Sequence, residues 1–315
     1  MKKLMSIALI VMMVASILTG CKQQAVQPPE PQTKPEASSK PLTMEDPAGN
    51  EITVPEEINT IISMAPSITE VLVDLGYGDK IIAVDKNSKD LPGLPEGIPH
   101  IDMMSPDVEQ IITLKPDLIL ASTITMSDGS DPMIQLKDAG ICLAYIPSSD
   151  SIEGIYNDLM FISRVINEEE KGQAIVDNMK EKVSEIKKIG DTVTSKKSVY
   201  FEIGAAPYIY SFGKGVFLNE MIELIGATNV LGNEEGWISV SEEAVVAANP
   251  EIIITNVNYI ENPVDEIKSR AGWENINAIK NNEVYYVDNM ASSLPNHNVI
   301  KALEEMAKAV YPEMY

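Results

Sequence analysis

The sequence predicts an α/β protein with two lobes of mostly parallel sheet, joined by a single long α-helix. Three observations indicate this fold. Apolar strand-like segments alternate with helical segments in both halves of the chain, which is the pattern of βαβ units. A stretch of the first half recurs in the second half, and an uninterrupted helical pattern lies between them. The length of 315 residues is sufficient for two separate cores.

The first half begins with an expected hairpin over Thr43–Val54, where the turn residues Pro47–Asn50 separate two short strand-like stretches. Ser67 is expected to cap a helix over Ser67–Leu75, and Gly76 is expected to end it. The other expected elements of this half are the strands and helices at Ile58–Met64, Lys80–Val84, Asp107–Leu114, Asp117–Ala121, Asp131–Ala139 and Ile141–Ile146.

A second series of the same kind follows residue 195. Its expected elements lie at Ser198–Ile203, Phe217–Ile225, Glu242–Ala248, Glu251–Thr255, Glu283–Val287 and Asn298–Ala309. Between the two series, Val165–Ile189 contains no proline and carries an apolar stripe at helical spacing. We therefore expect a connecting helix over residues 165–190, about 37 Å long, between an N-terminal lobe of residues 42–164 and a C-terminal lobe of residues 191–315.

The two series contain a repeat. Asp107–Leu120 aligns without a gap to Ser241–Ile254, with glutamate at the third position, proline at the tenth, then an acid and three aliphatic residues. The alignment places Glu109 opposite Glu243, each in the first turn of its helix, where the helix dipole favours a carboxylate. Homologous lobes explain this repeat. The alternatives are two ordinary helix starts and convergent α/β sequence patterns.

The N-terminus has the pattern of an export signal. Lys2 and Lys3 precede the apolar run Leu4–Leu18, which is typical of a secretory signal peptide and too short for a spanning helix. The run Leu18–Cys21 resembles the bacterial lipobox, which implies cleavage after residue 20 and lipidation of Cys21. An ordinary signal peptide with an accidental cysteine is the alternative. Residues 21–41 are rich in proline, and we expect them to form an extended tether to the membrane.

The composition excludes several functions. The chain has 24 Lys+Arg against 47 Asp+Glu and a formal net charge of −23, so nucleic acid is not expected as a partner. Two cysteines and two histidines do not support a disulfide framework or a His-rich metal site. Only Arg164 and Arg270 are arginines, so bidentate carboxylate or phosphate clamps must be scarce.

The chain resembles a known family over roughly residues 42–315. The segments that carry the resemblance are Ser63–Glu70, Leu114–Ile119, Phe212–Ile222, Gly236–Glu243 and Val284–Asp288. They look like the helical-backbone (class III) substrate-binding lipoproteins of ABC transporters, the cobalamin and iron-siderophore periplasmic-binding family. The resemblance implies two Rossmann-like lobes, a ligand held between them, and ABC permease and ATPase subunits as partners. It also implies that Glu109 and Glu243 dock on arginines of the permease, and we expect a monomer that is not an enzyme.

The resemblance also indicates ligand-binding positions. Trp237 and Tyr210 match aromatic positions of cobalamin-binding members, whereas another such position carries Met103 and Met104, which ordinary core packing also explains. The loop before the last helix contains Asn296, His297 and Asn298 and no arginine, which favours a ligand with amides over an anionic siderophore. Ser67 and Asn87 complete the expected ligand-binding set.

We therefore expect a cobalt corrinoid as the bound ligand, with a ferric siderophore or haem as the alternative, and no resident cofactor or metal. His297 is a candidate axial ligand to cobalt or haem iron, or else a polar residue at the rim of the cleft. Two other classes of protein are the alternatives to a binding protein. An exported α/β metalloenzyme or hydrolase is disfavoured because the chain has no Gly-x-Ser-x-Gly elbow and no P-loop. A lipoprotein for adhesion or signalling would reuse the same fold.

Overall fold

The computed structural model describes residues 42–129 and 131–315. The predicted signal peptide, Cys21 and the tether lie outside the described residues. No helix in the two described ranges is long and apolar enough to cross a membrane.

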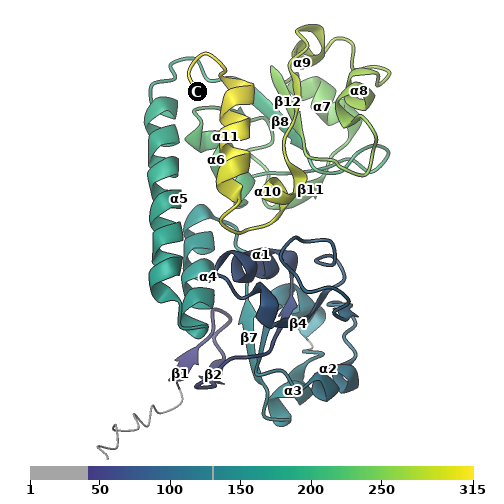
Figure 1. Cartoon of the computed structure of the whole chain (residues 1–315). Coiled ribbons are helices and arrows are strands. Elements are labelled where there is room, and N and C mark those ends of the chain that lie inside the picture. The colour runs from purple at the N-terminus through teal and green to yellow at the C-terminus, as the bar shows by residue number, and fades with distance from the viewer. Residues whose placement is uncertain (1–41, 130) are drawn as a thin grey trace, which may run out of the picture. The chain divides into compact units, whose positions relative to one another are not determined.

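The N-terminal lobe contains a hairpin and a parallel sheet (Figure 1). Strands β1 (Leu42–Glu45) and β2 (Glu51–Val54) pair antiparallel, which confirms the predicted hairpin. The five-stranded sheet has the order β5-β4-β3-β6-β7, and all of its neighbouring strands are parallel. Its strands and helices are β3 Ile61–Met64, α1 Pro66–Asp74, β4 Ile81–Asp85, β5 His100–Ile101, α2 Val108–Leu114, β6 Leu118–Ser122, α3 Ile134–Asp138 and β7 Cys142–Ile146, with 3₁₀ segments at Gly78–Lys80 and Thr123–Gly129.

The C-terminal lobe repeats this plan with a four-stranded parallel sheet of order β10-β8-β12-β13. In it β10, β8, β12 and β13 occupy the places of β4, β3, β6 and β7, so the repeat extends to the sheet order. A separate antiparallel pair joins β9 to β11. The elements are β8 Ser198–Glu202, β9 Tyr210–Phe212, α6 Phe217–Leu224, β10 Thr228–Asn229, β11 Trp237–Ser239, α7 Glu242–Ala248, β12 Ile252–Thr255, α8 Pro263–Lys268, α9 Asn277–Lys280, β13 Val284–Tyr286, α10 Asn289–Ser293 and α11 Val299–Val310.

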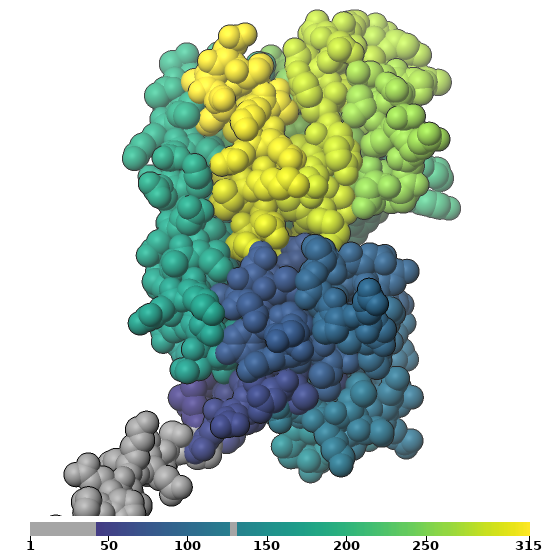
Figure 2. Space-filling model, in the orientation of Figure 1, coloured from purple at the N-terminus to yellow at the C-terminus, as the bar shows by residue number. Residues whose placement is uncertain are grey.

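One long helix, α5, joins the two lobes as predicted, but it begins four residues later than expected. Helix α4 (Ile152–Val165) ends where the single helix was predicted to start, and α5 runs over Glu169–Gly190. Asn167 has a φ of 60° and so interrupts the helical path between them. Helix α5 is about 33 Å long, and in Figure 2 it runs beside both lobes. Gly172 permits its close approach to α4, because a Cβ there would lie 2.0 Å from the Ser163 hydroxyl oxygen.

The N-cap of helix α1 lies two residues earlier than the sequence indicated. Ala65, not Ser67, is its N-cap residue, no side chain caps it, and Pro66 occupies its first turn. Proline suits that place because its missing N–H has no partner in the helix anyway. The predicted end is confirmed: Gly76 has a φ of 90°, its N–H donates to the Val73 carbonyl, and the Tyr77 N–H donates to the Leu72 carbonyl.

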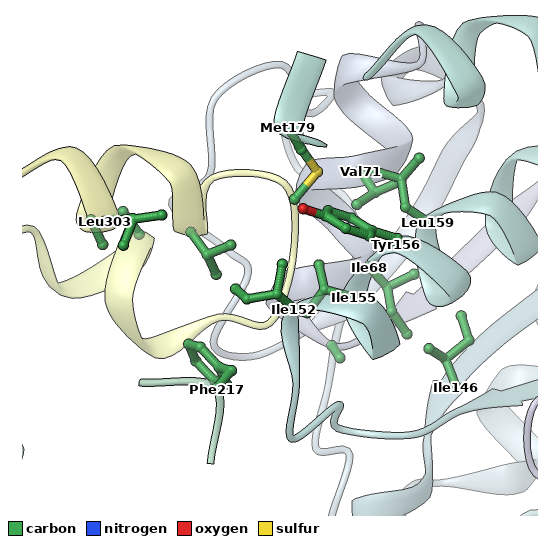
Figure 3. Packing of buried hydrophobic residues seen from close by; sticks show 14 of the residues in the cluster. Ile68, Val71, Ile146, Ile152, Ile155, Tyr156, Leu159, Met179, Phe217 and Leu303 are labelled. Carbon is green, nitrogen blue, oxygen red and sulfur yellow. The ribbon is translucent and has the colours of Figure 1, made fainter. Parts of the chain in front are cut away.

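One buried apolar cluster extends through both lobes by way of α4 and α5. Figure 3 shows side chains of this cluster from α1, α4, α5, α6 and α11, among them Ile68, Val71, Tyr156, Met179, Phe217 and Leu303. Smaller clusters pack on the other face of each sheet, around Tyr145 in the N-terminal lobe and around Trp273 in the C-terminal lobe. Because the main cluster is continuous, a large separation of the lobes would expose apolar surface and is disfavoured.

Candidate functional site

The repeated helices α2 and α7 are alike in detail. Each has seven residues, and each N-cap side chain, Asp107 or Ser241, accepts a hydrogen bond from the backbone N–H three residues on. Each ends in the left-handed conformation, with φ 50° and ψ 56° at Lys115 and φ 46° and ψ 58° at Asn249. The repeat is therefore a repeat of backbone geometry as well as of sequence.

Asp117 and Glu251, the acids that follow Pro116 and Pro250 in the repeat, make the same contact between neighbouring strands in both lobes. A carboxylate oxygen of Asp117 accepts hydrogen bonds from the N–H and hydroxyl of Thr60, at 2.9 Å each. A carboxylate oxygen of Glu251 accepts the equivalent pair from Ser198, at 2.9 and 3.1 Å. Each acid thus ties the start of its strand to the start of the neighbouring parallel strand.

Glu109 and Glu243 occupy matching places in this geometry. Both lie in the first turn of their helix, and both side chains are exposed. In Figure 1, α2 and α7 lie on the side of the molecule away from α5. The two carboxylates are therefore presented to solvent from equivalent positions, one on each lobe.

The carboxyl ends of the two sheets face the boundary between the lobes. The side-chain amide of Asn296, in the segment after β13, donates to the Ser67 carbonyl, in the segment directly after β3, at 3.4 Å. Residues that follow the other parallel strands lie at these same two sheet edges. In open α/β sheets, this edge is where ligands bind.

The C-terminal lobe carries exposed aromatic side chains at its edge. Trp237 of β11 is 48% exposed and packs edge-on against the buried Phe212 of β9, with ring centroids 5.9 Å apart at 76°. Tyr210 of β9 is 40% exposed and pairs with Ser239, two residues from Trp237, so both side chains lie on one face of the β9–β11 pair. Sequence reasoning did not find Tyr259, which is exposed and whose hydroxyl oxygen accepts a hydrogen bond from the Ala205 N–H, in the loop before β9.

The N-terminal lobe presents mostly apolar side chains. Met104, after β5, is 54% exposed. Met103 is buried in the smaller cluster around Tyr145, as the core-packing alternative predicted. Ile124, after β6, is exposed and was not singled out in the sequence. Asn87, after β4, is exposed, and its backbone N–H donates to the Asp85 carboxylate at 2.8 Å.

The segment Asn296–Asn298 binds helix α1 of the other lobe. The amides of Asn296 and Asn298 both donate to one carboxylate oxygen of Glu70, at 2.6 and 3.0 Å. The His297 Nε2 lies 2.6 Å from an Asp74 carboxylate oxygen, and its Nδ1 is buried without a partner. The side chains of Asn296, His297 and Asn298 were expected to contact a ligand or to lie at the rim of the cleft. In this structure they hold the two lobes together.

A narrow pocket beside this contact is lined by both lobes and by α4. Its lining includes Ser67, Asn296 and Asp158, and its volume of about 10 Å³ holds about one water molecule. Asp158 is buried, accepts a hydrogen bond from the Ser149 hydroxyl at 2.5 Å, and has its pKa raised to about 6, chiefly by burial. The pocket is far smaller than the sites that hold drug-sized ligands, so Ser67 and Asn296 line a space too small for a corrinoid.

A second lobe-to-lobe contact lies at the start of α4. The backbone N–H of Ile152, in the first turn of α4, donates to the Glu220 carboxylate of α6 at 2.8 Å. A carboxylate is favourable there because the first N–H groups of a helix have no partner within it.

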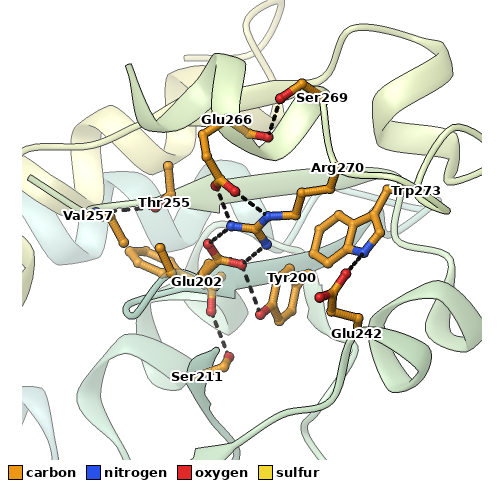
Figure 4. A network of polar contacts seen from close by, with 12 residues as sticks. Tyr200, Glu202, Ser211, Glu242, Thr255, Val257, Glu266, Ser269, Arg270 and Trp273 are labelled. Carbon is orange, nitrogen blue, oxygen red and sulfur yellow. Dashed lines mark hydrogen bonds and ion pairs between the residues drawn. The ribbon is translucent and has the colours of Figure 1, made fainter. Parts of the chain in front are cut away.

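Both arginines are already paired, and Figure 4 shows the pairing of Arg270. Arg270, 8% exposed, donates two hydrogen bonds of 2.7 Å to the Glu202 carboxylate and also pairs with Glu266. Arg164 pairs with Glu169 at 3.2 Å, at the junction of α4 and α5. Neither guanidinium is therefore free to bind an anionic ligand.

Comparison with known proteins identifies the family. Residues 61–291 match the family model described as periplasmic binding protein. The chain belongs to the periplasmic binding protein family. It is 33% identical over 317 residues to an uncharacterized ABC transporter substrate-binding lipoprotein, YvrC, of Bacillus subtilis, covering 100% of this chain and 99% of that one.

Two further relatives bear on the ligand class. A vitamin B12-binding protein of Vibrio parahaemolyticus is 27% identical over 258 residues, covering 80% of this chain and 90% of its own. The solved structure of a possible iron-binding, periplasmic solute-binding protein of Staphylococcus epidermidis is 31% identical, with a TM-score of 0.70 over 81% of this chain and 100% of that chain. The two-lobe fold is thus that of periplasmic binding proteins, which are solute-binding proteins of ABC transporters and not an enzyme family.

Proposed function

We propose that this periplasmic binding protein captures a corrinoid between its lobes and delivers it to the permease of an ABC importer. The aromatic edge of the C-terminal lobe carries the proposal most directly. Trp237 and Tyr210 offer flat apolar surface that a macrocycle can stack on or pack against. On the N-terminal lobe, Met104 and Ile124 offer exposed apolar surface, and the methionine is adaptable in shape.

The charges support a ligand without a large negative charge. Both arginines are engaged by carboxylates, and Lys86, which precedes Asn87, pairs with Asp102 at 2.6 Å. An anionic siderophore would have to bind without a free guanidinium. A corrinoid with neutral amide side chains needs hydrogen-bond partners instead, and Asn87 is an exposed amide at the same sheet edge.

A ferric siderophore or haem is the alternative ligand. The relative of Staphylococcus epidermidis supports it, because a protein 31% identical to this chain is described as iron-binding. His297 would serve as an axial ligand to cobalt or haem iron only after its contact with Asp74 opens. The two ligand classes predict different outcomes in a binding screen.

The remaining parts of the proposal concern location and delivery. Residues 1–20 would direct export, Cys21 would carry the lipid, and residues 21–41 would tether the lobes to the outer face of the cytoplasmic membrane. Glu109 and Glu243 would dock on basic residues of the permease, which works with an ATPase subunit. The naming of the Bacillus subtilis relative as a lipoprotein supports the anchor. We propose that the protein acts as a monomer.

A thermal-shift screen tests the ligand class. Purified residues 22–315 are heated with cyanocobalamin, haem and a set of ferric siderophores, since a ligand that binds only the folded state raises the unfolding midpoint. The proposal predicts a concentration-dependent rise with corrinoids. A rise with siderophores or haem alone would replace the corrinoid with that alternative.

A further inference from the structure

Helices α1 and α6 are a second pair of equivalent helices in the two lobes. Glu70–Gly76 aligns without a gap with Glu220–Gly226, with an aliphatic residue at the third position of each and glycine at the seventh. Both helices end in the same way: φ is 90° at Gly76 and 83° at Gly226, and the N–H of the next residue donates to the carbonyl five residues before it. The two glutamates therefore occupy the same place on equivalent helices.

Each glutamate crosses the lobe boundary to the start of a helix in the other lobe. Glu70 accepts hydrogen bonds from the amides of Asn296 and Asn298 at 2.6 and 3.0 Å, and Asn298 is the N-cap residue of α11. Glu220 accepts a hydrogen bond of 2.8 Å from the N–H of Ile152, the first residue of α4. Helix α4 follows β7, and α11 follows β13 by way of α10; these strands hold equivalent places in the two sheets. The two contacts are therefore reciprocal.

The start of α11 is arranged to hold a carboxylate from the other lobe. Asparagine at an N-cap usually accepts a hydrogen bond from its own helix, but Asn298 makes no such bond and its amide donates to Glu70. Its backbone N–H donates to the side-chain oxygen of Asn296 at 2.8 Å, and Asn296 is 2% exposed. A carboxylate is favourable beside the N-terminus of a helix, so Glu70 takes the place of an ordinary cap.

Helix α4 keeps its own cap and also receives a carboxylate. The Ser151 hydroxyl oxygen accepts a hydrogen bond from the Gly154 N–H at 3.2 Å, and the N–H of Ile152 donates to Glu220. The first N–H groups of a helix have no partner within it. Both α4 and α11 thus begin with a polar group that binds a glutamate of the other lobe.

We infer that Glu70 and Glu220 form a reciprocal pair of interlobe clamps, which fix the width of the cleft between the lobes. Separation of the lobes at their boundary breaks these contacts, because each joins one lobe to a helix start of the other. A cleft of fixed width holds the exposed Trp237 and Met104, on opposite lobes, at a set separation before a ligand arrives, and such preorganisation strengthens binding. This last step rests on the proposed function, whereas the clamps do not. Glu70 and Glu220 are thus positioning residues, which act on the ligand through the cleft.

The strength of the clamps follows from their charge. A hydrogen bond to a charged group shifts an equilibrium by roughly 10- to 150-fold. Removal of one glutamate should therefore favour separated lobes by a factor of this order, and removal of both should favour them most. The apolar cluster that runs through α4 and α5 contains neither glutamate, so the variants are expected to fold.

Distances between spin labels test the clamps without any ligand. The labels are attached to Thr113→Cys on α2 and Ala247→Cys on α7, two exposed positions on opposite lobes. In residues 22–315 the one natural cysteine, Cys142, is buried. The wild type should give one narrow distance distribution. Glu70→Ala and Glu220→Ala should each add a population at longer distance, which is largest when both are combined. Identical distributions in the wild type and both folded variants would overturn the inference.

Control variants separate the clamps from a general effect of removing a glutamate. Glu223→Ala is the matched control, because this exposed glutamate lies on α6 and accepts a hydrogen bond from Asn219 of the same helix. It should match the wild type, and equal separation of the lobes in this variant would refute the clamps. Glu70→Gln and Glu220→Gln keep a neutral acceptor and should lie between the wild type and the alanine variants. If an alanine variant lacks an unfolding transition, a wild-type distribution in both glutamine variants overturns the inference.

Calorimetric titration with cyanocobalamin tests the positioning role. The apparent affinity of each variant should fall in proportion to its remaining closed fraction, so a variant that is about nine-tenths open should bind about tenfold more weakly. Wild-type affinity in a variant with separated lobes would refute the positioning role. If the wild type itself does not bind cyanocobalamin, the proposed ligand is wrong, and the distances alone decide whether the clamps hold the lobes.

Discussion

Replacing Asp158 with asparagine should stabilise the protein at pH 8 and change how its stability depends on pH. Asp158 lies in the pocket between the lobes, 7% exposed, next to Ile155 and Leu159. Burial raises its pKa from 3.8 to about 6, and the hydrogen bond from Ser149 opposes only part of that rise. The charged form is therefore disfavoured in the folded protein.

The magnitude follows from this pKa. Below about pH 4 the carboxyl group is protonated in both the folded and the unfolded state, so it carries no ionisation penalty. Between about pH 4 and 6 the folded state holds a proton that the unfolded state has lost, so the free energy of unfolding falls as pH rises. The total loss is about 3 kcal/mol and is complete above about pH 6.

Urea denaturation of the wild type and Asp158→Asn between pH 4.5 and 8 measures this loss. The difference between the two proteins should grow with pH and level off near pH 7, because the amide has no ionisation to lose. Asp150→Asn, at an exposed position two residues before α4, is the control and should follow the wild type. A difference that is constant over this range, or that shrinks as pH rises, would refute the burial argument.

Three further predictions concern the ligand, the permease and the buried ion pairs. Trp237→Ala should weaken corrinoid binding by about tenfold or more in calorimetry, because it removes a large exposed aromatic surface at the site. Glu109→Ala combined with Glu243→Ala should reduce uptake by cells while the affinity for the ligand is unchanged. Arg270→Met should lower the free energy of unfolding by about 3–5 kcal/mol, because Glu202 would remain buried without its partner. Adding Glu202→Gln should restore part of that loss in urea denaturation.

Matched controls make these results specific. Trp237→Phe keeps a ring and should bind more tightly than Trp237→Ala; equal affinities for both variants and the wild type would place Trp237 outside the site. Glu170→Ala with Glu181→Ala, exposed on α5, removes the same charge and should leave uptake intact. Loss of ligand affinity in the Glu109 and Glu243 variant would instead assign those residues a structural role. Equal unfolding free energies for Arg270→Met and the wild type would contradict the cost of an unpaired buried carboxylate.

The sequence predicted the features that depend on local patterns. The alternation of strands and helices, and the repeat that pairs Glu109 with Glu243, follow from periodicity and from prolines and acids at fixed positions. The same signals could have placed the start of α1 correctly, since Pro66 is more informative than Ser67 about a first turn. Asn167 was a similar signal within the predicted connecting helix. Asparagine tolerates a positive φ, so it could have indicated the break before α5.

Contacts between segments that are distant in the chain could not be predicted from the sequence. The pairing of Asn296 and Asn298 with Glu70 joins residues more than 220 positions apart, and no local pattern indicates it. The burial of Arg270 against Glu202 likewise depends on how α8 packs on the sheet of its lobe. Tyr259 and Ile124 are different, because each follows a strand that was predicted. Their position at the carboxyl end of a sheet could therefore have been predicted from the topology alone.

Calorimetric titration of the purified protein with cyanocobalamin tests the central claim most directly. The account predicts one site of submicromolar affinity, weakened in Trp237→Ala and unchanged in the variant that lacks the Glu109 and Glu243 carboxylates. The absence of binding heat with cyanocobalamin and related corrinoids, together with tight binding of a ferric siderophore or haem, would contradict it.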